Sequence, residues 1–135
     1  MKPTPDIHAW LESFASAVRA SNLAAGKQLF APSVHAFGTV LAEADGIEAL
    51  GAGQWSVVWP CTRDFRFDPG TLRCSLSRQG DLAAVAGRWS SQRRSDGGLR
   101  EGRFTLVLSR GDSAGAWKAI HSHFSITPTD HGQLG

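Results

Sequence analysis

Two histidines near the C-terminal end of the chain have the spacing of a metal-binding pair. His121 and His123 flank Ser122 in a run that alternates as a β-strand does, so their side chains lie on one face. Two imidazoles on one face can share a metal ion, yet a catalytic zinc site needs a third protein ligand. His8, His35 and the scattered carboxylates have no spacing that selects one of them as that ligand. We therefore predict no metal site and interpret the pair as hydrogen-bonded or interface histidines.

Nucleophilic and acid/base chemistry has equally few candidates. Ser122, Cys61 and Cys74 stand outside the Gly-rich strand-to-helix turn that exposes a catalytic nucleophile. His35 is the remaining acid/base candidate, although an imidazole near the start of a strand is more often a surface or satisfied core residue. We therefore predict no catalytic residue, with His35 as a weak candidate, and two reduced thiols in a reducing compartment.

Arg103 is the cation whose neighbours indicate a binding role. Thr105 and Val107 share its face of the predicted strand. An arginine in that setting either extends past the strand edge to water or lies in a pocket, where it would bind a carboxylate or a phenolate. The pattern leaves both alternatives open. In the second case the ligand carries an acidic group.

The size and composition of the chain indicate one globular domain. Its 135 residues suit a single domain, which we place at 1–128, followed by a C-terminal tail at 129–135. The net charge of +2 is too small, and the arginines too dispersed, for nucleic-acid binding. No apolar run approaches the roughly 20 residues that span a bilayer. Because the N-terminal segment has the pattern of an amphipathic helix and not of a signal peptide, we expect a cytoplasmic protein.

The elements that must position these residues change from helices to strands along the chain. Apolar residues at spacings of three and four predict helices at about 5–20, 22–30 and 46–59, with a strand at 34–41. After the third helix the period is two, and turns divide this part into five further strands, at 62–67, 71–78, 81–93, 99–110 and 116–126. Helices followed by a long antiparallel meander predict an α+β fold.

Six segments in a fixed order carry a resemblance to a known family. They are Phe30–Val34, Phe37–Thr39, Gly46–Leu50, Gly80–Val85, Arg103–Thr105 and Trp117–Ser125. Their order resembles that of the SnoaL-like branch of the nuclear transport factor 2 superfamily, which also contains the ketosteroid isomerases. The resemblance implies an NTF2-like cone, in which three N-terminal helices pack on a curved antiparallel sheet in the order α-α-β-α-β-β-β-β-β. It also implies a pocket between the concave face and the helices, and a homodimer formed through the convex face.

The resemblance, combined with strand alternation, implies which side chains line that pocket. Alternating residues of three of the later strands join two tryptophans of the third helix on the concave side. The predicted ligand pocket consists of Trp55, Trp59, Trp89, Arg103, Thr105, Ile120, Ser122 and Phe124. For any one of the tryptophans, a place in the core is the more common role. The opposite parity places Phe104, Leu106 and Leu108 on the convex face, where a second subunit would cover them.

Both positions at which the resembling enzymes hold an acid/base group lack one here. Lined up through Phe30 and Ala31, the base of the ketosteroid isomerases corresponds to Gly38, and the last-strand aspartate of the limonene-epoxide-hydrolase and cyclase relatives corresponds to Ser122. The chain also contains no tyrosine. We therefore predict a protein that binds a small organic molecule in an aromatic pocket, without a cofactor. Two alternatives remain: an isomerase-, cyclase- or hydratase-like enzyme acting on a steroid- or polyketide-like substrate through a group such as His35, or a dimerisation scaffold.

Overall fold

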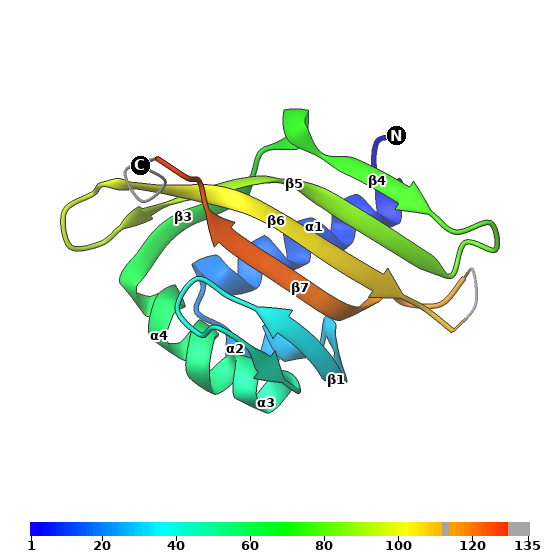
Figure 1. Ribbon diagram of the computed structural model, residues 1–135, viewed down its shortest axis with the longest axis horizontal. Helices are drawn as coiled ribbons and strands as arrows, with labels where there is room; N and C mark the ends of the chain where they lie inside the picture. The colour runs from blue at the N-terminus through cyan, green and yellow to red at the C-terminus, as the bar shows by residue number, and fades with distance from the viewer. Residues whose placement is uncertain (112–113, 130–135) are drawn as a thin grey trace, which may run out of the picture.

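The computed structural model describes residues 1–111 and 114–129 as a sheet that curls around a set of helices (Figure 1). Helix α1 (Pro5–Arg19) begins with a proline, whose missing N–H costs nothing in the first turn. Its buried residues recur at spacings of three and four, and they are Ile7, Trp10, Leu11, Phe14, Ala15, Ala17 and Val18. α2 (Leu23–Lys27) follows and is capped by the Asn22 side chain, which accepts a hydrogen bond from the N–H of Ala25 at 3.0 Å.

The third helical segment is continuous from Ile47 to Cys61 but changes its winding. α3 (Ile47–Leu50) passes into a π-helical turn (Gly51–Trp55), then into α4 (Ser56–Val58) and a 3₁₀ turn (Trp59–Cys61). Such π turns are often found next to functional sites. Here the turn ends on two adjacent buried side chains, Gln54 and Trp55. None of the helices within the described ranges is both long and apolar enough to cross a membrane.

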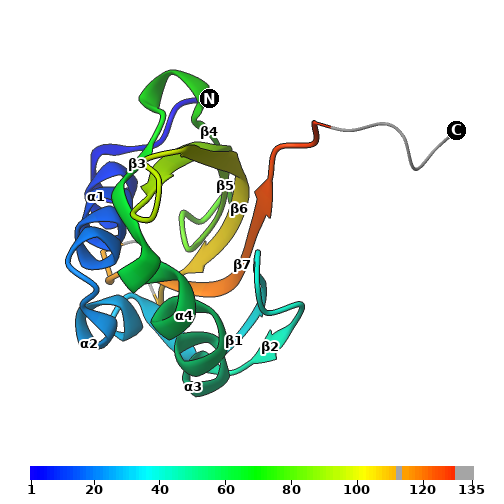
Figure 2. The same cartoon turned by 90° about the vertical axis from the view of Figure 1, so that its left-hand side faces the viewer.

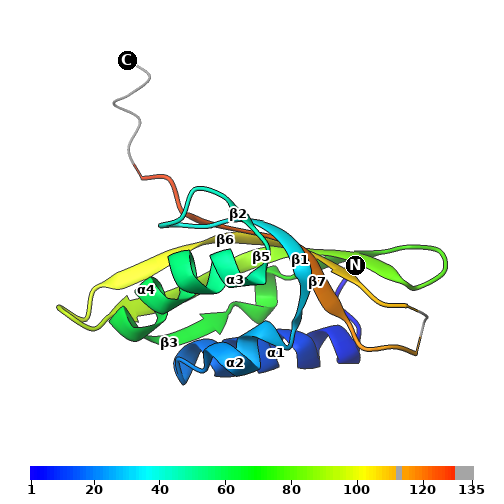
Figure 3. The same cartoon turned by 90° about the horizontal axis from the view of Figure 1, so that it is seen from below.

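Within the described residues, seven strands form one sheet in the order β2-β1-β7-β6-β5-β3, with β4 paired to β5. They are β1 (Phe30–Phe37), β2 (Ala44–Asp45), β3 (Thr62–Phe67), β4 (Arg73–Leu76), β5 (Leu82–Arg93), β6 (Leu99–Ser109) and β7 (Lys118–Ile126). The α+β cone is confirmed: Figure 2 shows the sheet curling toward the helices, and Figure 3 shows α1 and α2 along one side of it. The sheet is mixed and not wholly antiparallel, because β1 runs parallel to β7.

β3 and β4 do not pair with each other, as consecutive strands of a meander would. Both pair with β5, which is 12 residues long and so has room for two partners along one edge. Phe67 of β3 is opposite Trp89, and Cys74 of β4 is opposite Val85. A short 3₁₀ turn at Pro69–Thr71, capped by the Asp68 carboxylate, makes the connection. β3 and β4 therefore lie one after the other along the same edge of β5.

The prediction of which β6 side chains point inward is wrong by one residue. Antiparallel partners that lie directly opposite each other share a face of the sheet. Val85 is buried and lies opposite Leu106, so Leu106 must point inward as well. The inward side chains of β6 are accordingly Phe104, Leu106 and Leu108, all at most 3% exposed. These three residues fill the core and cannot form the dimer contact that the sequence suggested for them.

The N-terminal end of α1 is tied to the segment that joins β6 and β7. The Asp6 carboxylate accepts hydrogen bonds from Arg110 Nη1 at 2.9 Å and from Trp117 Nε1 at 3.1 Å. The guanidinium of Arg110 also lies 4.0 Å over the ring of Trp117. The opposite terminus is described only as far as Thr129, so the predicted tail at 129–135 otherwise lies outside the described residues.

Candidate functional site

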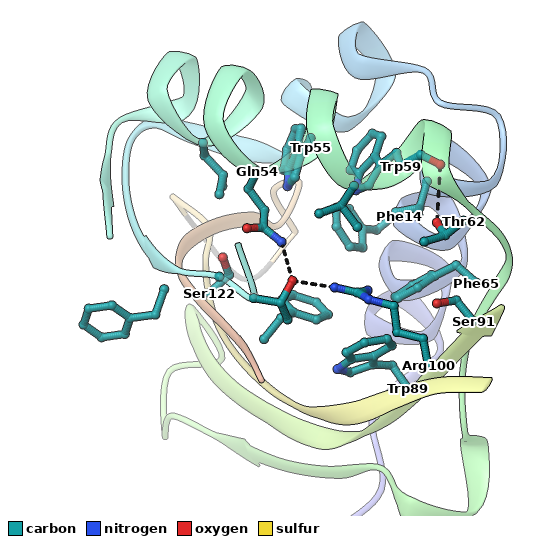
Figure 4. A pocket seen from close by; sticks show the side chains of 17 residues that line it. Phe14, Gln54, Trp55, Trp59, Thr62, Phe65, Trp89, Ser91, Arg100 and Ser122 are labelled. Atoms are coloured by element: carbon teal, nitrogen blue, oxygen red, sulfur yellow. Dashed lines mark hydrogen bonds between the residues drawn. The ribbon is translucent and has the colours of Figure 1, made fainter. Parts of the chain in front are cut away.

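A cavity lies between α1, the helical segment 47–61 and the concave face of the sheet (Figure 4). Its walls are mainly aromatic, formed by Phe14, Trp55, Trp59, Phe65, Trp89 and Phe124. The space open to the centres of water molecules is about 50 Å³. That is room for several waters or one small ring.

The aromatic rings present flat surfaces whose orientations are fixed by packing. Trp55 and Trp59 stack with their centroids 4.6 Å apart and an interplanar angle of 18°. Phe14 meets the edge of Trp59, with centroids 5.8 Å apart. On the sheet side, Trp89 donates its indole N–H to the carbonyl of Arg103 at 3.1 Å, which fixes its ring plane. An apolar ring entering the cavity would meet rigid stacking surfaces on both sides.

Gln54 organises the polar end of the cavity. Its Oε1 accepts hydrogen bonds from the backbone N–H groups of Val40 and Leu41 at 2.9 and 2.8 Å. That acceptor role fixes the amide orientation, so Nε2 faces Thr39 and donates to its Oγ1 at 2.8 Å. Gly38 is required beside this amide, because a Cβ there would lie 2.5 Å from Oε1.

Arg100 is the cation of the cavity lining. Its Nη2 donates to Thr39 Oγ1 at 2.6 Å, and its guanidinium carbon lies 5.2 Å from the centroid of Trp89. Burial lowers the pKa of Arg100, and the nearby charge of Arg93 lowers it further, although an arginine stays protonated at neutral pH. Among residues 1–111 and 114–129, no carboxylate forms an ion pair with it. A half-buried cation without a counter-ion is costly for the fold.

Ser91 adds an unsatisfied hydroxyl to the same wall. Its side chain is 2% exposed, and its Oγ is the buried side-chain polar atom that lacks a hydrogen-bond partner in the described part of the chain. An orphaned buried hydroxyl costs about 1–3 kcal/mol. Ser91 lies directly opposite Arg100 in the β5–β6 register, so the two residues are neighbours on the inner face.

The structure brings together five of the eight predicted pocket residues. Trp55, Trp59, Trp89, Ser122 and Phe124 all line the cavity. Arg103, Thr105 and Ile120 do not: each is exposed, and the prediction that they face the pocket is wrong. Arg103 and Thr105 lie on the outer face of the sheet, as does Val107, which alternates with them along β6. Arg103 there donates to Ser125 Oγ at 3.3 Å.

The side chain of Ile120 points away from the cavity because the pairing of β7 with β6 is irregular. Leu106 is opposite Ser122 and Val107 is opposite His121, but Leu108 is opposite Ala119. The register therefore shifts by one residue at Ile120, and strict alternation across it fails. Ser122 and Ala119 both point inward as a result, and Ile120 is 40% exposed.

Gln54, Arg100 and Thr39 of the cavity lining were not predicted, although two of them leave a signal in the sequence. Arg100 has the same parity as Phe104 and Leu106, the most apolar set of its strand. Gln54 follows Ile47 by seven positions and Leu50 by four, which is the spacing of the inner helix face. Thr39 follows a strand and leaves no such signal.

Three histidines, His35, His121 and His123, lie on the outer side of the β1–β7 pair. His35 is directly opposite His121, with their Nδ1 atoms 3.2 Å apart, and His35 Nε2 lies 2.7 Å from a carboxylate oxygen of Glu43. Burial, followed by the charge of His35, lowers the pKa of His121. His35, the weak catalytic candidate, is thus directed away from the cavity. No group of three or more His, Cys, Asp or Glu side chains within the described residues could hold a metal ion.

The lining can hold and orient a molecule but has no group suited to moving a proton. Arg100 is its ionisable side chain, and the lining contains neither a carboxylate nor an imidazole. Gly38 and Ser122, the positions at which the resemblance placed an acid/base group, both line the cavity. The two positions that the resemblance aligns with an acid/base group therefore line the cavity, and neither carries a side chain suited to proton transfer here.

Solved structures of similar proteins share this fold. An NTF2-like protein of unknown function from Pseudomonas putida is 24% identical, over 96% of this chain and 89% of its own, with a TM-score of 0.77. A Xanthomonas campestris protein whose name assigns it to the calcium/calmodulin-dependent protein kinase II association domain is 18% identical, over 93% and 88%, with a TM-score of 0.78. A ketosteroid isomerase-like protein from Erwinia carotovora is 14% identical, over 91% and 95%, with a TM-score of 0.71.

These identities are low, so the likeness shows the fold alone. No protein with a curated description matches the chain. The sequence model of the SnoaL-like domain, in contrast, matches residues 7–129, which include every residue of the cavity lining. This chain belongs to the SnoaL-like domain family.

Proposed function

We propose that this protein binds a small, flat and largely apolar molecule in the aromatic cavity and performs no proton transfer on it. The observation that supports this proposal is the composition of the lining: stacked aromatic walls with neither a carboxylate nor an imidazole among them. The limited volume favours a single ring over a steroid-sized ligand, which would require the walls to move.

The enzymatic alternative depends on an acid/base group that reaches the ligand. Its candidate, His35, points to the outer face and is engaged by Glu43 and His121. A water-mediated route from that imidazole would have to cross the sheet. The geometry therefore supports binding over catalysis.

The experiment is a thermal-shift and tryptophan-fluorescence titration with neutral one-ring compounds, such as benzamide and benzyl alcohol. We expect these compounds to raise the melting temperature and to alter the emission of Trp55, Trp59 and Trp89. Ser122→Leu places a larger side chain in the cavity and should abolish both effects. Ser125→Leu places the same side chain on the outer face of β7 and should retain them. Equal binding by the two variants, or no binding by the native protein, would refute the proposal.

A further inference from the structure

The polar end of the cavity carries hydrogen-bond donors for which the described chain supplies no acceptor. Arg100 uses Nη2 for Thr39, and none of its other N–H groups donates to a described residue. Ser91 contributes a buried hydroxyl without a partner in the described chain. A group of unpaired donors that includes one positive charge is best satisfied by a negatively charged hydrogen-bond acceptor on the ligand.

Thr39 supplies the third donor, because both of its acceptor positions are occupied. Its Oγ1 accepts from Gln54 Nε2 at 2.8 Å and from Arg100 Nη2 at 2.6 Å. A hydroxyl oxygen has two lone pairs, so the remaining hydrogen-bonding capacity of Thr39 is its O–H. No acceptor for that proton is hydrogen-bonded to it in the part of the chain that the structure describes. The hydrogen bonds from Gln54 Nε2 and Arg100 Nη2 therefore converge on Thr39 Oγ1, and Figure 4 draws both of them as dashed lines that start from the labelled Gln54 and Arg100.

Arg100 links the three donors to the aromatic wall of the cavity. It donates to Thr39 through Nη2, it is directly opposite Ser91 in the β5–β6 register, and its guanidinium lies over the ring of Trp89. A ligand ring between the tryptophans and phenylalanines would therefore present its substituent to these donors. Resting on the proposed function, we propose that the ligand is an aromatic monocarboxylate, whose carboxylate binds the guanidinium of Arg100 and the hydroxyls of Thr39 and Ser91.

The charge and the donor count select a carboxylate among anions. One guanidinium balances one negative charge, so a phosphate dianion would bring an unpaired charge into a partly buried site. A phenolate has one oxygen for the three donor groups. A carboxylate has two oxygens and about four lone-pair positions, and it matches the planar fork of the guanidinium.

Calorimetric titration with benzoate tests the inference, with benzamide and benzyl alcohol as neutral ligands of the same shape. At pH 7 we expect the native protein to bind benzoate at least about tenfold more tightly than benzamide. Arg100→Met should weaken benzoate binding by about 10- to 150-fold and benzyl alcohol binding by much less, and an unchanged circular dichroism spectrum shows that the variant is folded. Arg103→Met, on the outer face of the same strand, is the matched control and should bind benzoate normally.

Ser91→Ala gives a second readout, because its two effects have opposite signs. The substitution removes an orphaned buried hydroxyl, so the melting temperature of the free protein should rise. The same substitution removes a carboxylate donor, so benzoate affinity should fall by about 2- to 10-fold. Ser75→Ala, exposed on β4, should change neither quantity.

The outcomes separate this inference from the proposed function. Tight binding of neutral rings with no preference for benzoate, or equal effects of Arg100→Met and Arg103→Met, would overturn the carboxylate assignment and leave the aromatic cavity as proposed. Acetate binding as tight as benzoate would show a general anion site and would also overturn it. Failure of every one-ring compound, charged or neutral, would overturn the proposed function and this inference together.

Discussion

At the scale of single residues, Gln54 decides whether the polar end of the cavity keeps its shape. Gln54→Leu removes the acceptor of two backbone N–H groups and the donor to Thr39. We expect it to lower the free energy of unfolding by about 1–3 kcal/mol in urea denaturation, because those partners lose their hydrogen bonds. Gln92→Leu is the control, since that amide accepts only an exposed hydrogen bond from Arg63. A loss for Gln54→Leu no larger than that of the control would contradict the role assigned to it.

The site illustrates how far alternation alone can predict side-chain direction. Trp55 and Trp59 could be found because a helix face repeats over several turns and includes large apolar residues. Arg103 could not be placed correctly, because a strand has only two faces and one wrong assignment inverts every residue on it. Weighing hydrophobicity first would have placed Phe104 and Leu106 inward, and Arg100 with them. Ser91 gains its role from the β5–β6 register and Thr39 from its hydrogen bonds with Gln54 and Arg100, and both depend on contacts between segments that are distant in the sequence.

At the scale of elements, the predicted helices and strands are present in the predicted order, but the two-residue strand β2 between β1 and α3 was not predicted. Two features of the strand pairing also had no signal in the sequence. The shift in register at Ile120 depends on how β7 fits β6, which is a contact between segments and not a local pattern. The parallel pairing of β1 with β7 likewise brings together strands that are far apart in the sequence. Local periodicity carries information on each strand alone, so neither feature could be read from it.

The β1–β7 pair makes the stability of the fold dependent on pH. The pKa of His121 is lowered from its ordinary value near 6.5, so the folded state resists a proton that the unfolded state accepts. Stability is therefore highest above pH 6.5 and falls as the pH drops below that value toward the folded-state pKa. The charges of His35 and His123 also act on this imidazole, and Glu43 contacts His35.

We expect His121→Gln to flatten the loss of stability between pH 7 and pH 5, measured as urea midpoints at several pH values. His8→Gln removes an exposed imidazole on α1 and should leave the slope as it is in the native protein. Native and His121→Gln proteins with the same slope would show that His121 does not account for this dependence.

At the scale of the whole molecule, the outer face of the sheet is the surface on which we expect a second copy to dock. Its centre carries small and apolar side chains, since Ala84 is opposite Val107 and Ala86 is opposite Thr105. Ile120 adds an exposed apolar side chain on β7. A stable dimer would bury on the order of 1,200–2,000 Å² there.

Sedimentation at micromolar concentration tests this expectation. The native protein should sediment as a dimer, and Val107→Glu should shift it to monomer because a charge would then lie within the interface. Ala24→Glu, exposed on α2, should leave the dimer intact. A native monomer would refute the dimer, and Val107→Glu remaining dimeric would place the contact elsewhere.

The parallel pairing of β1 with β7 also has a consequence for the chain as it is synthesised. His35 and His121 are partners although they lie 86 positions apart. At ordinary translation rates, the synthesis of β1 therefore precedes the synthesis of β7 by on the order of 4–17 s. During that interval one edge of β1 is open, and open edges are where nascent chains associate wrongly. The sheet is therefore completed only when β7, which emerges late from the ribosome, pairs with β1. Destabilising substitutions in β7 should reduce the yield of folded protein more than equally destabilising substitutions in β4.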